Sequence, residues 1–331
     1  MNTARLTECG ARTERMLLYI NENAATEHGV GGNGWMSKID GETPITAINI
    51  PGTHDSATEY VSFAFVSRTQ ALSIAEQLEA GVRYFDMRFE KTENGFKAVH
   101  SLSDCREGKS IFSEKLTAEK IIGDCSAFLS ENPSETILFQ LREDDGDAGD
   151  SFFESFYELF IKNNPDLWFC ENRIPKLGEV RGKIVLLRVG GIDGEKFTDK
   201  NSGINFSMYP YIDGMKKHDY RREDIKTLEG TAYCSMYVQD SYQLLGRRKL
   251  AAIEGFLASE LDRAEFNICM TNCTGILMPW MNAIYVNRRL KEYGFESGRY
   301  YGIVAADFID QELCRMIYSS NFREVGATLI K

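Results

Sequence analysis

The chain has 331 residues, of which 43% are hydrophobic and 26% are charged, and its formal net charge at pH 7 is −11. This composition excludes a disordered, collagen-like or coiled-coil chain and is typical of one large folded domain or two ordinary ones. The acidic balance argues against nucleic-acid binding, which needs many Lys and Arg contacts to phosphate.

The elements expected from the sequence begin after a polar, glycine-rich stretch. We expect residues 1–34 to be an N-terminal extension and residues 35–331 to form the folded domain. Helices are expected on apolar residues at helical spacing, the first capped by Thr117 and ended by Asn132-Pro133, the others over 152–160 and 250–261. Eight runs are expected to be strands, at residues 46–50, 82–88, 97–100, 136–141, 183–187, 236–238, 266–270 and 301–306.

Strands that alternate with helices predict parallel βα units, and at this length a (β/α) barrel is the simplest arrangement. The fold class expected is therefore α/β, a barrel of the TIM type. The gap after the first strand is too short for a regular helix, so the barrel is expected to be distorted or incompletely closed.

The compartment is inferred from three features of the sequence. No run of 18 apolar residues is present, and the first 20 residues carry charges throughout, so we expect neither a transmembrane helix nor a signal peptide. We expect a cytoplasmic protein, or a secreted one if a leader was removed. The eight cysteines are scattered, so most are expected to be buried thiols rather than a disulfide framework or a zinc site.

In a barrel of this kind, chemistry is carried by residues at the C-terminal ends of the strands. Polar residues stand at most of the predicted strand ends, namely His54, Asp55, Asp86, Arg88, His100, Arg142, Glu143, Arg188, Asp240, Tyr242 and Asp307. This set includes two of only four histidines in the chain.

His54 and His100, with Arg88 between them in sequence, suit the cleavage of a phosphodiester without a metal. Two imidazoles can act as a general base and a general acid, and an arginine can hold a phosphoryl group with a fixed fork of donors. The alternative is structural: a histidine at a strand end is often only hydrogen-bonded. Asp86 could likewise cap the barrel edge, and Tyr242 could be a rim aromatic without a ligand.

Two segments, IPGTHDS at residues 50–56 and AGVRYFDMR at residues 80–88, resemble the leading catalytic segments of the bacterial-type phosphatidylinositol-specific phospholipase C family, which is built on an X domain. Shorter stretches at 99–100, 132–136, 181–187 and 238–242 are also similar, and the resemblance covers residues 35–308.

The resemblance implies a role for each matching residue. His54 would be the general base on the inositol 2-hydroxyl, oriented by Asp307. His100 would be the general acid to the diacylglycerol oxygen, assisted by Asp55.

The remaining matches would hold the substrate. Arg88 would bind the phosphoryl oxygens, where the eukaryotic branch uses calcium, and Asp86 would support Arg88 and His100. The inositol ring would be bound by Arg142, Asp240 and Tyr242.

Two positions depart from the family pattern. Arg188 lies one residue away from the next inositol-binding arginine of the family, whose matching place is Val189. Ser101 follows His100 where a glycine is expected.

The acidic run at 143–147 lacks EF-hand spacing and is expected to be a solvated loop.

The expected activity is a metal-independent phosphatidylinositol diacylglycerol-lyase of the phospholipase C type, without a cofactor, that forms diacylglycerol and inositol 1,2-cyclic phosphate. Glycosylphosphatidylinositol is a second candidate substrate. We expect a monomer that meets a phosphatidylinositol-containing membrane transiently, and the apolar residues 60–66 are expected either to insert into that surface or to pack in the core.

Two alternatives remain open from the sequence. One is another barrel phosphodiesterase that acts on glycerophosphodiesters, although such enzymes usually hold a metal with carboxylates at the strand ends. The other is a catalytically silent inositol-lipid-binding module.

Overall fold

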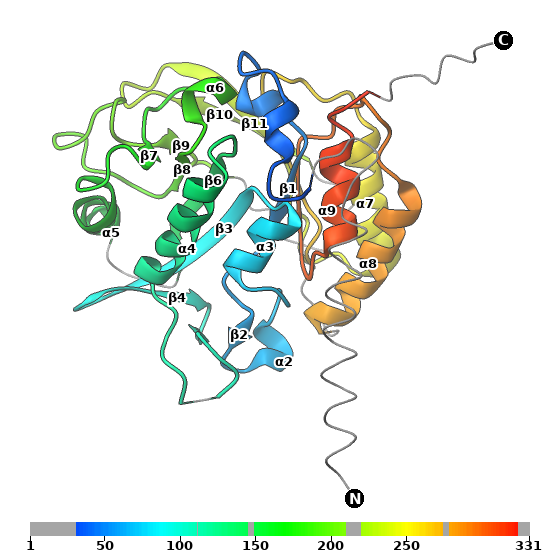
Figure 1. Cartoon of the computed structure of the whole chain (residues 1–331), viewed down its shortest axis with the longest axis horizontal. Coiled ribbons are helices and arrows are strands. Elements are labelled where there is room, and N and C mark those ends of the chain that lie inside the picture. The colour runs from blue at the N-terminus through cyan, green and yellow to red at the C-terminus, as the bar shows by residue number, and fades with distance from the viewer. Residues whose placement is uncertain (1–30, 111, 145–148, 210–219, 274–277, 324–331) are drawn as a thin grey trace, which may run out of the picture.

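The structure is a computed structural model that describes residues 31–110, 112–144, 149–209, 220–273 and 278–323. Parallel strands form its centre and most helices lie outside them (Figure 1). The parallel strands pair in the order β11 (Ala232–Gln239), β12 (Phe266–Met270), β13 (Ile303–Ala306), β1 (Ile50–Thr53), β3 (Tyr84–Thr92), β6 (Ile137–Glu143) and β8 (Ile184–Val189).

Short strands complete the two ends of this sheet. Strand β8 also pairs in parallel with β7 (Trp168–Phe169) and β9 (Ile204–Asn205), and β10 (Arg221–Lys226) pairs antiparallel with β11. In the described part of the chain, β9 and β10 approach each other without a strand ladder. The side chain of Asn205 bridges this seam, donating to the Lys226 carbonyl at 3.2 Å. The expected α/β barrel, distorted and incompletely closed, is confirmed.

The helices cover the outside of the strands. They are α3 (Ile74–Ala80), α4 (Ala118–Glu131), α5 (Asp150–Phe156) with the π-helical turn η3 (Tyr157–Ile161), α6 (Leu177–Val180), α7 (Gly246–Ala258), α8 (Pro279–Tyr293) and α9 (Gln311–Ser319). Thr117 caps α4 as expected, because its hydroxyl accepts from the Lys120 amide at 3.3 Å. Among the described residues, no helix combines the length and the apolar character needed to cross a bilayer.

The strand expected at residues 46–50 is wrong in its position. Ile45–Ala47 form a 3-10 turn (η2), and the strand begins only at Ile50 and runs through Pro51 and Gly52. Pro51 has no N–H to donate and contributes only its carbonyl, which accepts from the Arg83 amide at 2.9 Å. Gly52 is required by packing, since a Cβ there would lie 2.8 Å from the Tyr84 ring.

The strand expected at residues 97–100 exists but does not belong to the barrel. It is β4 (Gly95–His100), which pairs antiparallel with β3 and continues into β5 (Ser103–Arg106). Only two residues separate β3 from β4, and a parallel crossover needs a dozen or more. The hairpin therefore extends beyond the barrel at its C-terminal end.

The chain just before β1 packs across the N-terminal end of the barrel. Trp35 is fully buried and its indole donates to the Gly81 carbonyl at 3.0 Å. Beneath it, Arg83 and Glu135 form a buried ion pair at 2.9 Å, and Arg83 also donates to the Gly32 carbonyl at 2.9 Å. Of the expected extension, residues 31–34 thus join the fold and residues 1–30 lie outside the described residues.

Candidate active site

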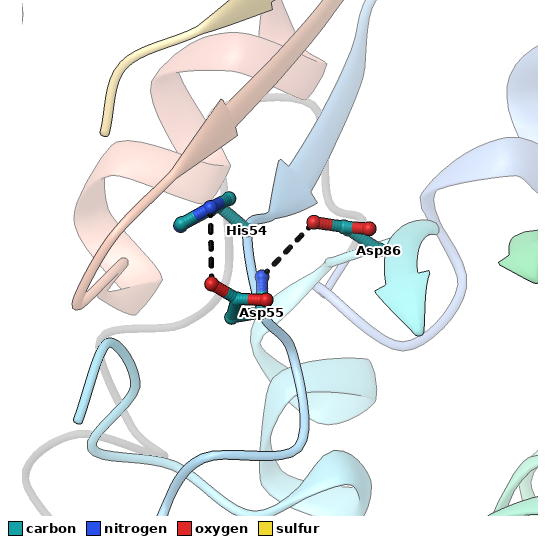
Figure 2. Close-up of side chains that lie close together, drawn as sticks. All are labelled: His54, Asp55 and Asp86. Carbon is teal, nitrogen blue, oxygen red and sulfur yellow. Dashed lines mark hydrogen bonds and ion pairs between the residues drawn. The ribbon is translucent and has the colours of Figure 1, made fainter. Parts of the chain in front are cut away.

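Strand register brings most of the predicted residues to one end of the barrel. Thr53 of β1 lies opposite Ala306 of β13, so the residues that follow, His54 and Asp307, are neighbours. In the same way, β3 places Asp86 beside His54. Figure 2 shows how His54, Asp55 and Asp86 converge from the ends of these strands.

His54 is held through both ring nitrogens. Its Nδ1 lies 2.8 Å from Asp307 Oδ1 and its Nε2 lies 3.1 Å from Asp55 Oδ2. Burial by itself lowers the pKa of this ring, but the charges of Asp55 and Asp307 outweigh it and raise the pKa to about 9. In the neutral ring, a proton on Nδ1 faces Asp307 and Nε2 is the nitrogen that can accept, so His54 can act as a base through Nε2.

Asp55 joins the two histidines. Its Oδ2 lies 3.1 Å from His54 Nε2 and 3.1 Å from His100 Nε2, and its Oδ1 pairs with Nε of Arg88. Burial would raise the pKa of this carboxyl, but Arg88 and the two rings hold it below its usual value. A buried anion thus lies between the two imidazole rings and the guanidinium of Arg88.

His100 reaches this point from the β4–β5 hairpin. Its Nδ1 lies 2.7 Å from the Ser67 carbonyl while its Nε2 faces Asp55. Both partners are acceptors, so the ring is placed to carry a proton on each nitrogen and to donate one. The following Ser101 adopts φ +51°, which explains why a glycine was expected there, and its amide donates to Asp144 at 2.6 Å.

Arg88 contacts His54 and the carboxylates of Asp55 and Asp86, and its charge is fixed. Its Nη2 lies 2.9 Å from Asp86 Oδ2 and 3.2 Å from His54 Nε2. Burial lowers the pKa of Arg88, but Asp55 and Asp86 raise it well above its usual value. Asp86 is steadied in turn by Gln140, whose amide donates to Oδ1 at 3.0 Å.

The same atoms have the geometry of a cation site, because His54, Asp55 and Asp86 offer ligand atoms within 4.8 Å of one another. Arg88 bonds both carboxylates, so the guanidinium already supplies the positive charge that a metal would bring. The residue set therefore fits an arginine-centred site better than a metal site.

Two predicted substrate residues, Arg142 and Asp240, lie near this centre. Arg142 of β6 is paired with Arg88 of β3, so the two side chains point to the same side of the sheet. Asp240 follows β11 and is buried, and its Oδ1 has no hydrogen-bond partner among the described residues. Burial raises the pKa of Asp240, against the charge of the buried Lys249. Tyr242 follows two residues later and is partly exposed.

Arg188 is not brought into this group. It is paired with Leu141, whereas the next residue is paired with Arg142, so Arg188 points to the opposite side of the sheet. There it lies over the ring of Phe153 in α5, at 5.7 Å, and donates to the Ser202 carbonyl at 2.9 Å. The structure thus corrects its assignment to the substrate site, because alternation of side chains along β8 directs it outward.

Asn272 was missed from the sequence although it contacts the central histidine. Its Nδ2 lies 3.1 Å from His54 Nε2. A usable signal was present, because Asn272 stands two residues after β12 and is a polar residue at a predicted strand end. Gln140, inside β6, offered no such signal.

Apolar side chains rim the mouth of the site. In and beside α2 (Ala64–Ser67), Phe63 is 74% exposed and Phe65 is 66% exposed, which excludes core packing for both. Ser67 at the end of this helix holds His100, so the patch adjoins the site. Leu102, in the turn after His100, is also exposed, as are Trp280 and Ile284 near the start of α8.

Comparison with known proteins points to one family. Residues 48–189 match the model described as phosphatidylinositol-specific phospholipase C, X domain. The chain is 27% identical over 322 residues to the 1-phosphatidylinositol phosphodiesterase of Listeria monocytogenes, covering 91% of this chain and 89% of that protein. It is 29% identical over 250 residues to the protein of the same name from Staphylococcus aureus strain Newman, covering 72% and 74%.

Solved structures share the fold. A variant of phosphatidylinositol-specific phospholipase C from Staphylococcus aureus superposes with a TM-score of 0.69 at 23% identity, covering 87% of this chain and 97% of the other. The enzyme of the same name from Listeria monocytogenes gives a TM-score of 0.67 at 23% identity, covering 88% and 99%.

Proposed function

We propose that this chain, which belongs to the phosphatidylinositol-specific phospholipase C X-domain family through residues 48–189, cleaves phosphatidylinositol into diacylglycerol and inositol 1,2-cyclic phosphate. One observation carries the proposal: His54 and His100 both contact Asp55, with Arg88 bonded beside them. This arrangement supports the proposal that a base, an acid and a phosphoryl-binding cation act on one phosphodiester.

In the proposed step, His54 Nε2 takes the proton of the inositol 2-hydroxyl. The oxygen so freed forms a bond to phosphorus, and the bond from phosphorus to the glycerol oxygen breaks with its electron pair. His100 donates its proton to that oxygen, so neutral diacylglycerol leaves and the cyclic diester keeps one negative charge. Attack from within the substrate has the advantage of proximity over attack by water.

The carboxylates support these transfers. Asp307 on Nδ1 of His54 directs the other nitrogen toward the substrate and stabilises the imidazolium that forms. Arg88 balances the charge of the phosphoryl oxygens throughout, since guanidinium does not lose its proton near neutral pH. We therefore propose that the reaction needs no calcium.

Arg142, Asp240 and Tyr242 are proposed to hold the inositol ring. The unpartnered oxygen of Asp240 is a buried acceptor, which a ring hydroxyl would satisfy.

The exposed apolar side chains at the mouth are proposed to rest on the lipid surface. Solved structures of the Staphylococcus aureus relative concern its membrane binding. For a chain of net charge −11, an apolar patch such as the one around Phe63 and Phe65 supplies an attraction that overall charge cannot.

The proposal is tested by following phosphorus NMR spectra of phosphatidylinositol in detergent micelles. The cyclic phosphate should appear first and open slowly to the acyclic ester, while His54→Ala should form neither. Acyclic phosphate appearing first would contradict this mechanism and would favour the hydrolytic barrel phosphodiesterase. Binding without turnover would favour the silent lipid-binding module.

A further inference from the structure

Asn272 follows β12 by two residues, and the two polar atoms of its side chain differ in their surroundings. Its Nδ2 lies 3.1 Å from His54 Nε2, and its Oδ1 is buried with no hydrogen-bond partner among the described residues. The residue is only 4% exposed. A buried amide oxygen with nothing to accept is unfavourable, so this oxygen calls for a donor that the free protein does not supply.

Asn267, inside β12, shows what a structural role requires. It is also buried and its Oδ1 likewise has no hydrogen-bond partner among the described residues, but its Nδ2 donates to the carbonyls of Asp262 at 2.6 Å and Glu265 at 3.0 Å and lies 3.1 Å from the Tyr300 hydroxyl. Those three contacts tie loop segments together at the N-terminal end of the barrel. The amide of Asn272 ties no loop, because its Nδ2 lies against Nε2 of the proposed base and donates to that nitrogen when the ring is neutral.

The position of Asn272 limits which donor can reach it. Its neighbour His54 takes the proton of the attacking inositol 2-hydroxyl in the proposed reaction, so that hydroxyl has no second proton to offer. The phosphate is attached at carbon 1, which leaves the hydroxyl at carbon 3 as the other group adjacent to the nucleophile. A 3-hydroxyl can donate to Oδ1 while the 2-hydroxyl faces Nε2.

We infer that Asn272 is a substrate-binding residue whose Oδ1 accepts a hydrogen bond from the inositol 3-hydroxyl while its Nδ2 contacts His54. The inference rests on the proposed function and deepens it by naming a specificity contact. The Asn272 amide sets the distance between the attacking 2-hydroxyl and His54, because its Nδ2 contacts His54 while its Oδ1 holds the adjacent 3-hydroxyl. A head group that carries only the attacking hydroxyl would lose this positioning.

The test is a cycle of two changes, one in the protein and one in the substrate. Phosphatidylinositol and its 3-deoxy analogue are compared on the wild-type chain and on Asn272→Ala, and kcat and KM are determined separately. With the wild type, loss of the 3-hydroxyl should lower kcat/KM roughly tenfold, the upper value for one hydrogen bond between uncharged groups. With Asn272→Ala, the same loss should have an effect of less than about twofold.

Two further variants separate binding from folding. Asn267→Ala removes the buried asparagine inside β12 and should lower the unfolding midpoint while the wild-type discrimination between the two substrates persists. Asn272→Ser keeps a small polar group in case Asn272→Ala unfolds, and should likewise lose the discrimination. Equal penalties for the 3-deoxy substrate in the wild type and both Asn272 variants would overturn the inference.

A binding measurement distinguishes failure of this inference from failure of the proposed function. Free myo-inositol and its 3-deoxy analogue are titrated calorimetrically into the wild type and Asn272→Ala. If the wild type leaves phosphatidylinositol intact, the proposed function fails. The contact is still supported if only the wild type prefers myo-inositol, and it is overturned if both proteins bind the two compounds alike.

Discussion

His54 and His100 share one oxygen atom: Asp55 Oδ2 lies 3.1 Å from Nε2 of each ring. The ring centroids are 6.4 Å apart and the planes are nearly perpendicular. The two rings share Asp55 but differ at Nδ1, which faces the anionic Asp307 carboxylate in His54 and the neutral Ser67 carbonyl in His100. We assign the role of general base to His54, because Asp55 and Asp307 both stabilise its protonated ring.

The assignment predicts different responses to the leaving group. His54→Ala and His100→Ala should each lower turnover of phosphatidylinositol by roughly 10²–10⁴-fold. With an aryl inositol phosphate, whose leaving group needs no proton, His100→Ala should recover most of the lost rate and His54→Ala should not. Initial rates on both substrates measure this, and equal losses on both would contradict the acid role of His100.

The pKa of His54 predicts a shift in the pH profile. Because that pKa is raised to about 9, kcat/KM should rise with pH on the acidic side until His54 loses its proton. Asp307→Asn removes a negative charge from the ring and therefore lowers the pKa of His54, so the acidic limb should move to lower pH. The maximal rate should also fall because the ring is no longer held by a carboxylate.

The matched control is Asp310→Asn, three residues along the same chain. Asp310 caps α9 and pairs with Lys291, and no contact joins it to His54 in the described part of the protein. This variant should leave the acidic limb in place. An unshifted limb in Asp307→Asn would show that another group sets it.

Arg88 predicts that activity is independent of divalent metal ions. Excess EDTA should leave the rate unchanged, because the guanidinium supplies the charge at the phosphoryl group. Arg88→Lys should lower kcat by about 10²-fold or more, since one ammonium cannot reproduce a fork of donors aimed at the phosphoryl oxygens. Full inhibition by the chelator, restored by calcium, would refute this prediction.

The exposed side chains of Phe63 and Phe65 predict that vesicle binding can be weakened without lowering the rate of the chemical step. Phe63→Ser and Phe65→Ser should each weaken binding to phosphatidylinositol-containing vesicles by about tenfold or more, because burial of one phenylalanine side chain is worth about 1.5–3 kcal/mol. Turnover of a short-chain monomeric substrate should remain at the wild-type level. Sedimentation with vesicles measures the first effect.

Leu159 provides the control for this prediction. It is 52% exposed, but it lies in the turn after α5 on the outer helical layer. Leu159→Ser should bind vesicles as the wild type does. If it loses binding to the same extent, the rim around α2 is not the contact surface.

The buried Arg83–Glu135 pair predicts a large stability effect far from the site. Both side chains are fully buried and their charged atoms lie 2.9 Å apart. Glu135→Gln leaves the guanidinium without its counter-charge and should cost about 3–5 kcal/mol of the free energy of unfolding. Urea denaturation measures the loss, and exposed Glu158, paired with Lys162, gives a control variant Glu158→Gln with a far smaller effect.

The sequence by itself determined the class of fold and most of the site. Buried runs alternating with helical patterns predict a parallel barrel, and polar residues at the strand ends predict where its chemistry lies. His54 and Asp307 were found in this way because each directly follows a strand, and that placement depends only on local chain order. Asp86 was found although it lies inside β3, which continues to Thr92.

Tertiary structure alone decided which of these side chains meet. Arg142 and Arg188 look alike in sequence, yet the register of β6 and β8 turns one to the site and the other to the outer helices. His100 ends β4, a strand of the hairpin outside the barrel, and its ring nevertheless contacts Asp55. The exposure of Phe63 and the contact of Asn272 with His54 were likewise decided by tertiary structure. The physical reason is that period-2 alternation fixes which residues share a face, whereas the direction of that face is set by long-range pairing between strands distant in sequence.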